Sequence, residues 1–341
     1  MNNPRRVLLR FALLLGFSLA GFCLAGAAEE SAPSAPAPAS DAPPQKEAPA
    51  RGARGARGPR TPAPQSVSPR DALPWTPSDF NSLKPGLPTL IVAGDSTADK
   101  GPDAWHRGWA APLVDYFDTS KINVVNRARG GRSFRSFVRE GLWDQLVAAI
   151  KPGDIVMVQF GHNDGGDIKN ANGRPDLPGV GDETEAVKRP DGSEETVHTF
   201  GWYARKYVRD VRAKGGQPVL MSTTVYNRWN DGHHAFREST MRKWVMQVAA
   251  EEKVPFLDHG AFISARYEQL GQEGVKPFFA ADYLHTTTPG SIVNAEAFVA
   301  AVKAMKLEPL VSALNEKGRA VAPWTPAVPA PATAPETSPK Q

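Results

Sequence analysis

The segment PTLIVAGDS, residues 88–96, combines a short apolar run with an abrupt change to small polar residues. The run Pro88–Ala93 is almost entirely apolar, as in a parallel strand that helices cover on both faces. Gly94-Asp95-Ser96 follows directly, so the strand ends in a turn that carries a serine. In open α/β sheets, ligands lie beyond the carboxyl ends of the strands. The segment therefore predicts the fold class and the edge of the sheet at which a site is expected.

Similar apolar runs recur along the chain and alternate with segments of helical periodicity. Further strands are expected at Lys121–Asn126, Asp154–Phe160, Gln217–Thr223 and Val254–Leu257. Helices, with apolar residues three and four positions apart, are expected at Trp109–Phe117, Arg139–Ile150, Trp202–Lys214, Ala235–Lys253 and Ser291–Met305. Alternating strands and helices pair the strands in parallel and bury the sheet between two helix layers. We therefore predict an α/β fold, a three-layer α/β/α sandwich around a five-stranded parallel sheet.

Composition places this domain in the middle of the chain. Apolar residues make up 41% and charged residues 22% of the 341 residues, which is ordinary for a globular protein. Of the 32 prolines, ten lie in residues 31–70 and six in residues 322–341. Such segments bury too little apolar surface to offset the entropy of ordering. We expect a signal peptide at 1–27, a disordered Ala/Pro/Arg-rich linker at 28–79, a globular domain at 80–315 and a disordered Pro/Ala-rich tail at 316–341.

The amino-terminal segment has the three parts of an export signal. Three arginines precede the apolar run Phe11–Leu24, and Ala25-Gly26-Ala27 offers a cleavage site. The run is shorter than the ~20 residues of a membrane span, and an uncleaved anchor is the alternative. Cleavage after Ala27 removes Cys23, the single cysteine of the sequence, and with it any disulfide or thiol nucleophile. The mature protein is expected in the periplasm or outside the cell, without a membrane span.

The charge of the chain argues against a nucleic-acid partner. The formal net charge is +4, and residues 1–75 account for all of it with nine basic and five acidic side chains. The predicted domain is therefore balanced, whereas nucleic-acid binding requires a basic face. The linker run RGARGARGPR is either a solvated spacer or an attachment to an anionic polymer.

Four short polar motifs fall where the predicted sheet would bring them together. Ser96 follows the first strand, Gly131 the second and Asn163 the third, and Asp282 and His285 precede the last helix. Each motif alone is an ordinary cap or loop. Together they supply a nucleophile, two oxyanion donors and an Asp–His pair, the parts that acyl transfer requires. The sequence therefore predicts a serine hydrolase.

The same residues resemble the four blocks of the SGNH (GDSL-like) hydrolases. Three longer stretches are similar to the rhamnogalacturonan acetylesterases of carbohydrate esterase family twelve: GRSFRS at 131–136, FGHNDGG at 160–166 and HTT at 285–287. GVGDETE at 179–185, HTFGWY at 198–203 and RWNDG at 228–232 look like the bacterial members. The resemblance covers about residues 86–306. One departure is that the family's DHTH reads here Asp282-Tyr283-Leu284-His285, which puts the neighbouring substrate contacts in doubt.

The resemblance implies a flavodoxin-like SGNH hydrolase fold and an acyl-enzyme mechanism. Ser96 is expected as nucleophile, His285 as base and Asp282 as the orienting carboxylate. The N–H groups of Ser96 and Gly131 and the Asn163 amide are expected to form the oxyanion hole. No metal and no cofactor is expected.

The implied substrate is acetylated pectin, with rhamnogalacturonan first, for a monomeric, secreted carbohydrate esterase. Candidate substrate contacts are Arg132, Trp229 and Asn230. Arg132 either meets a galacturonate carboxylate or braces its loop by a salt bridge. Trp229 is a candidate sugar platform, whereas Trp109 is expected in the core. The alternatives are an esterase or acetyltransferase for xylan, an envelope polysaccharide or a non-carbohydrate ester, and a non-catalytic polysaccharide-binding protein.

Overall fold

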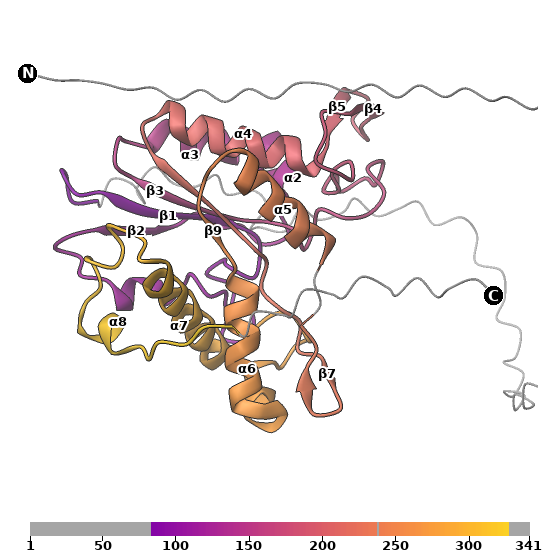
Figure 1. Ribbon diagram of the computed structural model, residues 1–341. Coiled ribbons are helices and arrows are strands. Elements are labelled where there is room, and N and C mark those ends of the chain that lie inside the picture. The colour runs from indigo at the N-terminus through magenta and orange to yellow at the C-terminus, as the bar shows by residue number, and fades with distance from the viewer. Residues whose placement is uncertain (1–82, 237–238, 327–341) are drawn as a thin grey trace, which may run out of the picture. The chain divides into compact units, whose positions relative to one another are not determined.

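The structure, a computed structural model, describes residues 83–236 and 239–326 and contains the predicted parallel sheet (Figure 1). Its five strands are β1 (Thr89–Gly94), β2 (Asn123–Asn126), β3 (Ile155–Gln159), β6 (Gln217–Met221) and β9 (Phe256–Leu257). They lie in the order β2-β1-β3-β6-β9, and every neighbouring pair is parallel. The predicted α/β fold and its five strands are confirmed. The strand order places the loops after β1, β2, β3 and β6 along one edge of the sheet.

Helices cover both faces of the sheet (Figure 1). One layer contains α2 (Phe134–Arg139), α3 (Leu142–Ala149), α4 (Phe200–Ala213) and α5 (Thr240–Glu251). The other contains the 3₁₀ helix η1 (Leu113–Tyr116), α6 (His259–Val275), α7 (Thr288–Met305) and α8 (Glu316–Ala320). Successive strand residues alternate between the layers: Leu90 and Val92 pack with α7, and Ile91 and Ala93 pack with α2 to α5. This alternation explains why β1 and β3, in the middle of the sheet, are apolar along almost their whole length.

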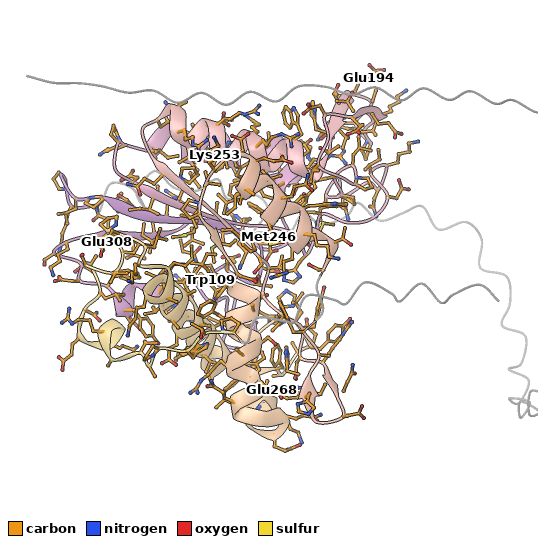
Figure 2. All side chains as sticks on the ribbon, in the orientation of Figure 1. Trp109, Glu194, Met246, Lys253, Glu268 and Glu308 are labelled. Carbon is orange, nitrogen blue, oxygen red and sulfur yellow. The ribbon has the colours of Figure 1, made fainter. Side chains whose placement is uncertain are left out.

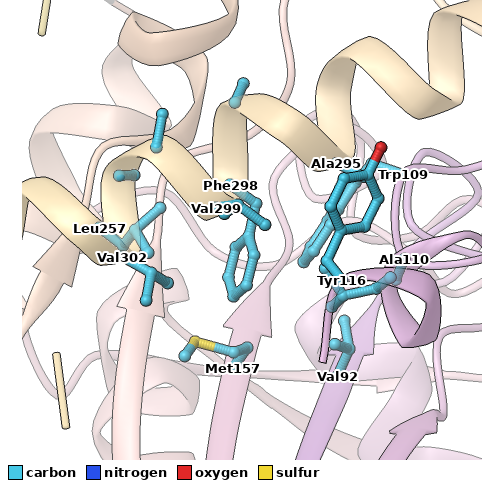
Figure 3. Packing of buried hydrophobic residues seen from close by; sticks show 14 of the residues in the cluster. Val92, Trp109, Ala110, Tyr116, Met157, Leu257, Ala295, Phe298, Val299 and Val302 are labelled. Atoms are coloured by element: carbon cyan, nitrogen blue, oxygen red, sulfur yellow. The ribbon is translucent and has the colours of Figure 1, made fainter. Parts of the chain in front are cut away.

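A part of the core with fully buried side chains joins α7 to the sheet (Figure 3). Phe298 and Val299 face Val92 and Met157, and Phe298 stacks on Trp109 at a centroid distance of 5.0 Å. All these side chains are fully buried, and each buried side chain of this size contributes about 1.5–3 kcal/mol. Trp109 lies inside the molecule (Figure 2), as expected. The core therefore anchors α7 directly behind the loop that carries His285.

The helix predicted at Trp109–Phe117 is wrong. A 3₁₀ helix of four residues, η1, occupies the end of this segment, and turns connect β1 to it. Gly101 has a φ of +73°, and Pro112 lacks the N–H that a helix would need. Ser96 therefore lies in a turn, and no α-helix begins after it.

Other helix boundaries also moved. The helix expected at Arg139–Ile150 corresponds to α3, which begins only at Leu142 because Gly141 before it adopts a φ of +72°, and α2 before it was not expected. The helix expected from Ala235 begins at Thr240, capped by Ser239. Helix α6 was not expected, since it follows a two-residue strand and contains a kink at Gly271.

The segment between β3 and α4, which we call the polar insertion (residues 166–198), contains a hairpin. Strands β4 (Thr184–Lys188) and β5 (Glu194–His198) pair antiparallel, with Glu194 at the outer end in Figure 2. Val187 and Val197 pack on Ile168 beneath them. A second hairpin, β7 (Trp229–Asn230) with β8 (His233–His234), follows β6.

The ordered domain extends past the boundary expected at residue 315. Helix α8 continues the chain, and the Trp324 indole N–H donates to the Phe262 carbonyl at 3.0 Å. The expected signal peptide, the linker and the tail beyond residue 326 lie outside the described residues. In the part of the chain that the structure describes, no helix is long and apolar enough to cross a membrane.

Candidate active site

Ser96 lies in the turn directly after β1, the second strand of the sheet. Gly94 permits this turn, because a Cβ there would lie 3.0 Å from the Gln159 carbonyl oxygen of β3. Asp95 is fully buried, and its Oδ1 accepts from both the N–H and the hydroxyl of Thr97. These contacts hold the turn closed and leave the Ser96 side chain partly exposed.

Three side chains from opposite ends of the domain form a chain of hydrogen bonds at Ser96. The distance from Ser96 Oγ to His285 Nε2 is 2.8 Å. On the other side of the ring, His285 Nδ1 lies 2.7 Å from Asp282 Oδ2. A base within hydrogen-bond reach of a hydroxyl, oriented by a carboxylate, is the arrangement that activates a serine nucleophile.

The Asp282 carboxylate is held by its own loop. Its Oδ1 accepts from the backbone N–H groups of Leu284 and His285, both at 2.7 Å. Partial burial raises the pKa of Asp282, but the hydrogen bonds from the His285 ring and from the two backbone groups outweigh it and lower the pKa below its ordinary value. The carboxylate therefore stays ionised and fixes the imidazole with a proton on Nδ1.

The loops after β2 and β3 lie beside this chain. A Cβ on Gly130 would lie 3.6 Å from the Ser96 Cβ, which places this loop against the serine. Gly131 follows with a φ of +75°, a conformation that glycine adopts without strain. The Asn163 side-chain amide donates to the Arg132 carbonyl at 3.0 Å, and its second N–H makes no hydrogen bond to a described residue. The structure thus brings the three predicted oxyanion donors to one edge of the sheet.

The first turn of α2 ties these two loops together. Ser133 caps the helix, and the Phe134 and Arg135 N–H groups donate to the carboxyls of Asp164 and Asp176. Both carboxyls are buried, and burial raises the pKa of Asp164 to about 7 and that of Asp176 well above its usual range.

Arg135 joins the β4–β5 hairpin to this arrangement. Its buried guanidinium binds both oxygens of Glu195 at 2.8 Å and donates to the Ile168 and Pro175 carbonyls. The hairpin is thereby fastened behind the loops of Gly131 and Asn163.

The three residues predicted to contact the substrate differ in their partners and in their burial. Arg132 binds Glu140 through Nε and Nη2 at 2.9 and 2.8 Å, so its contacts favour the bracing role over carboxylate binding. Trp229 is half-buried against the core, and its indole N–H donates to Asn227. Asn230 is exposed in the β7–β8 hairpin. No contact joins Trp229 or Asn230 to Ser96 or His285.

Several further side chains lie around the site. The His106 ring lies 5.8 Å from the His285 ring, and exposed Trp105 precedes it. Tyr226 and Tyr283 lie near each other on two loops that meet where the Asn227 N–H donates to the Tyr283 carbonyl. These contacts join residues far apart in sequence, so no local pattern marks them.

His162 faces the same edge of the sheet but supports the loop instead of Ser96. Its Nε2 lies 3.0 Å from Thr224 Oγ1. Burial lowers the pKa of His162, Asp95 opposes this effect, and His285 adds to it. Within residues 83–236 and 239–326, no three His, Cys, Asp or Glu side chains gather as a metal site.

Known proteins share this sequence pattern and fold. Residues 92–293 match the GDSL-like lipase/acylhydrolase family. A rhamnogalacturonan acetylesterase from Emericella nidulans is 37% identical over 216 residues, which are 63% of this chain and 84% of that protein. A probable rhamnogalacturonan acetylesterase from Bacillus subtilis is 28% identical over 233 residues, covering 67% of this chain and 98% of the relative.

A solved structure agrees with this assignment at the level of the fold. The crystal structure of the Bacillus subtilis protein YxiM superposes with a TM-score of 0.53 at 25% identity, covering 65% of this chain and 58% of that one. The family match spans more than half of the chain and includes the elements that carry Ser96 and His285. The chain therefore belongs to the GDSL-like lipase/acylhydrolase family, and it is an ester hydrolase.

Proposed function

We propose that the protein is an acetylesterase that removes O-acetyl groups from acetylated pectin, with rhamnogalacturonan as the first substrate. The observation that carries the proposal is the hydrogen-bonded chain Ser96–His285–Asp282 at 2.8 and 2.7 Å. Two relatives align with most of the domain. One is named a rhamnogalacturonan acetylesterase and the other a probable rhamnogalacturonan acetylesterase. All the reacting groups belong to one chain, so a monomer suffices. Export by the segment 1–27 would place the enzyme where polysaccharides are found.

The proposed reaction uses the three side chains in sequence. His285 Nε2 takes the proton of the Ser96 hydroxyl, and Oγ attacks the acetyl carbonyl carbon. The negative charge that develops on the carbonyl oxygen is stabilised by the N–H groups of Ser96 and Gly131 and by the Asn163 amide. Asp282 stabilises the imidazolium that forms. The carbon–oxygen bond to the sugar then breaks, and His285 returns the proton to the sugar oxygen.

Water completes the cycle. His285 removes a proton from water, the resulting hydroxide adds to the acetyl carbonyl, and the bond to Ser96 Oγ breaks. The proton passes to Ser96, and acetate leaves. If a sugar hydroxyl replaced water, the same groups would perform acetyl transfer.

The proposal is tested by acetate release from acetylated rhamnogalacturonan and from acetylxylan, assayed in parallel. We expect faster release from the pectic polymer, and no release by Ser96→Ala. Faster release from xylan would retain the esterase and contradict the substrate. Labelling of Ser96 by a serine-reactive probe without release from either polymer would contradict the polysaccharide assignment, and the absence of both would favour a binding protein.

A further inference from the structure

The loop after β6 carries an arginine that packs against two neighbouring tyrosine rings. The Arg228 Cζ lies 4.8 Å from the centroid of Tyr226 and 5.0 Å from that of Tyr283. The two ring centroids are 5.6 Å apart. We call these three residues the Tyr–Arg–Tyr cluster. Its rings are partly exposed, Tyr226 by 36% and Tyr283 by 53%, so the cluster faces solvent instead of filling the core.

In the described part of the chain, the charge of Arg228 has no acidic partner. Among residues 83–236 and 239–326, no carboxylate pairs with its guanidinium, and no oxygen accepts from its side-chain N–H groups. Neighbouring arginines differ: Arg132 binds Glu140, and Arg242 binds Asp258. Contacts with aromatic rings engage the faces of a guanidinium and leave its N–H edge for a planar, bidentate acceptor such as a carboxylate.

The cluster is attached directly to the catalytic loop. Tyr283 lies between Asp282 and His285 in the chain. The Tyr226 ring packs edge-on against His162 at 5.5 Å. A ligand bound by Arg228 would therefore be a neighbour of the sugar whose ester Ser96 attacks.

There is room beside the cluster for a sugar. A cavity of about 320 Å³ is lined by Tyr226, Arg228 and Thr224, among other residues, at the lower end of the ~300–1,000 Å³ that ligand sites occupy. Neither Ser96 nor His285 lines it. The cavity thus lies beside the Tyr–Arg–Tyr cluster and does not include the reacting groups, as expected for a subsite that binds another sugar of the substrate.

We propose that the Tyr–Arg–Tyr cluster is a carboxylate-binding subsite, in which Arg228 binds the carboxylate of a uronic acid next to the acetylated sugar. The assignment rests on the proposed function and deepens it, because it makes the enzyme selective for acidic over neutral glycans. The Tyr226 and Tyr283 rings hold the guanidinium in place and offer apolar faces to the sugar. Arg228 thus takes the role that the sequence had offered to Arg132.

The first test compares one substrate in two forms, acetylated rhamnogalacturonan oligosaccharides with their carboxylates intact or reduced to neutral alcohols. We expect the enzyme to prefer the acidic form by about tenfold in kcat/KM, the scale of a solvent-accessible charge-assisted pair. Arg228→Gln should bring this ratio close to one, and Arg228→Lys should restore part of it. Arg266→Gln is the matched control, because Arg266 also lies over an aromatic ring, Trp324, but on α6, and it should keep the ratio.

The second test needs no turnover and separates the two proposals. Unacetylated oligogalacturonides should bind the wild-type protein, and Arg228→Gln or high salt should weaken that binding about tenfold. Binding without acetate release from any pectic polymer would overturn the proposed function but would support the carboxylate-binding subsite. Release at equal rates from the acidic and reduced forms, or a ratio that Arg228→Gln leaves intact, would overturn the subsite. An equal loss on both forms would reduce the cluster to a neutral sugar platform.

Discussion

Asp282 holds His285 at two points. Its Oδ2 lies 2.7 Å from the ring Nδ1, and its Oδ1 accepts the His285 backbone N–H at 2.7 Å. The carboxylate thus determines both the path of the loop and the position of the imidazole proton. The second ring nitrogen is left facing Ser96 Oγ, where the proposed base must be.

Asp282→Asn tests this role. The amide oxygen can still accept the backbone N–H groups, so the loop should remain folded. The amide N–H₂ cannot accept from Nδ1–H, and the imidazole would turn to the wrong tautomer. We expect kcat/KM on an aryl acetate to fall by about 10⁴-fold, with an unchanged melting temperature. Activity near that of the wild type, together with complete loss in His285→Ala, would show that another group orients the histidine.

Asn163→Ala tests the oxyanion hole. One N–H of the Asn163 side-chain amide donates to the Arg132 carbonyl. The other N–H is therefore the one that could donate to the oxyanion. Loss of one oxyanion donor costs about 10²–10³-fold in kcat. Because the interaction is made in the transition state, kcat should fall while KM stays nearly constant. A rise in KM at constant kcat would instead assign Asn163 to substrate binding.

Gly131→Ala tests the geometry of the same site. A Cβ on Gly131 would lie 2.8 Å from Arg174 Nη2, and the residue has a φ of +75°. The methyl group strains the backbone and displaces the guanidinium, so the N–H should move and kcat should fall at least about tenfold. Gly192→Ala is the control, because its φ is +85° but nothing lies within 4 Å of an added Cβ. It should lose some stability and keep its activity; equal losses of activity in both variants would contradict the account.

The buried carboxyls Asp164 and Asp176 predict a pH-dependent stability. Each has an Oδ2 with no hydrogen-bond partner in the described part of the chain. Burial raises the pKa of Asp164 to about 7 and that of Asp176 well above its usual range. The folded state therefore binds more protons than the unfolded one, so stability is fully present below about pH 4 and is lost as pH rises through about 7.

Asp176→Asn should reduce this dependence. An asparagine can still accept from the Arg135 N–H, and its N–H₂ can donate to Asp164 without a second negative charge. We expect the free energy of unfolding in urea to fall less between pH 5 and pH 8 than in the wild type, by on the order of 1–3 kcal/mol. Asp191→Asn, at an exposed turn where the Ser193 side chain lowers the pKa of Asp191, should leave the slope unchanged. An unchanged slope in Asp176→Asn would contradict the assignment.

Local sequence patterns predicted the sheet and pointed to the candidate catalytic residues, because both depend on short-range features. The strands are continuous apolar runs, and Ser96, Gly131 and Asn163 each follow one directly. His285 was placed by its motif before the last helix. The hydrogen bonds of Ser96, His285 and Asp282 are the geometry that the motifs imply.

The features that the sequence did not predict depend on contacts between residues far apart in the chain. The sequence left two roles open for Arg132, and its salt bridge with Glu140 favours the bracing role. Tyr226 and Arg228 meet Tyr283 through a backbone hydrogen bond from Asn227, and His106 reaches His285 through pairing of Arg107 with Thr286. The hairpin of the polar insertion is fixed by Arg135 and Glu195, 60 residues apart. None of these pairings leaves a periodic or compositional signal.

The central claim is that Ser96 carries the acetyl group during the reaction, and acid-quenched peptide mapping tests it most directly. The wild-type domain is mixed with excess aryl acetate, quenched within the first turnovers and digested, and the peptide that contains Ser96 is weighed. We predict that this peptide gains the mass of one acetyl group, that Asn163→Ala slows its formation, and that Ser96→Ala shows none. An acetyl group on another residue, or full hydrolysis by Ser96→Ala, would contradict the account.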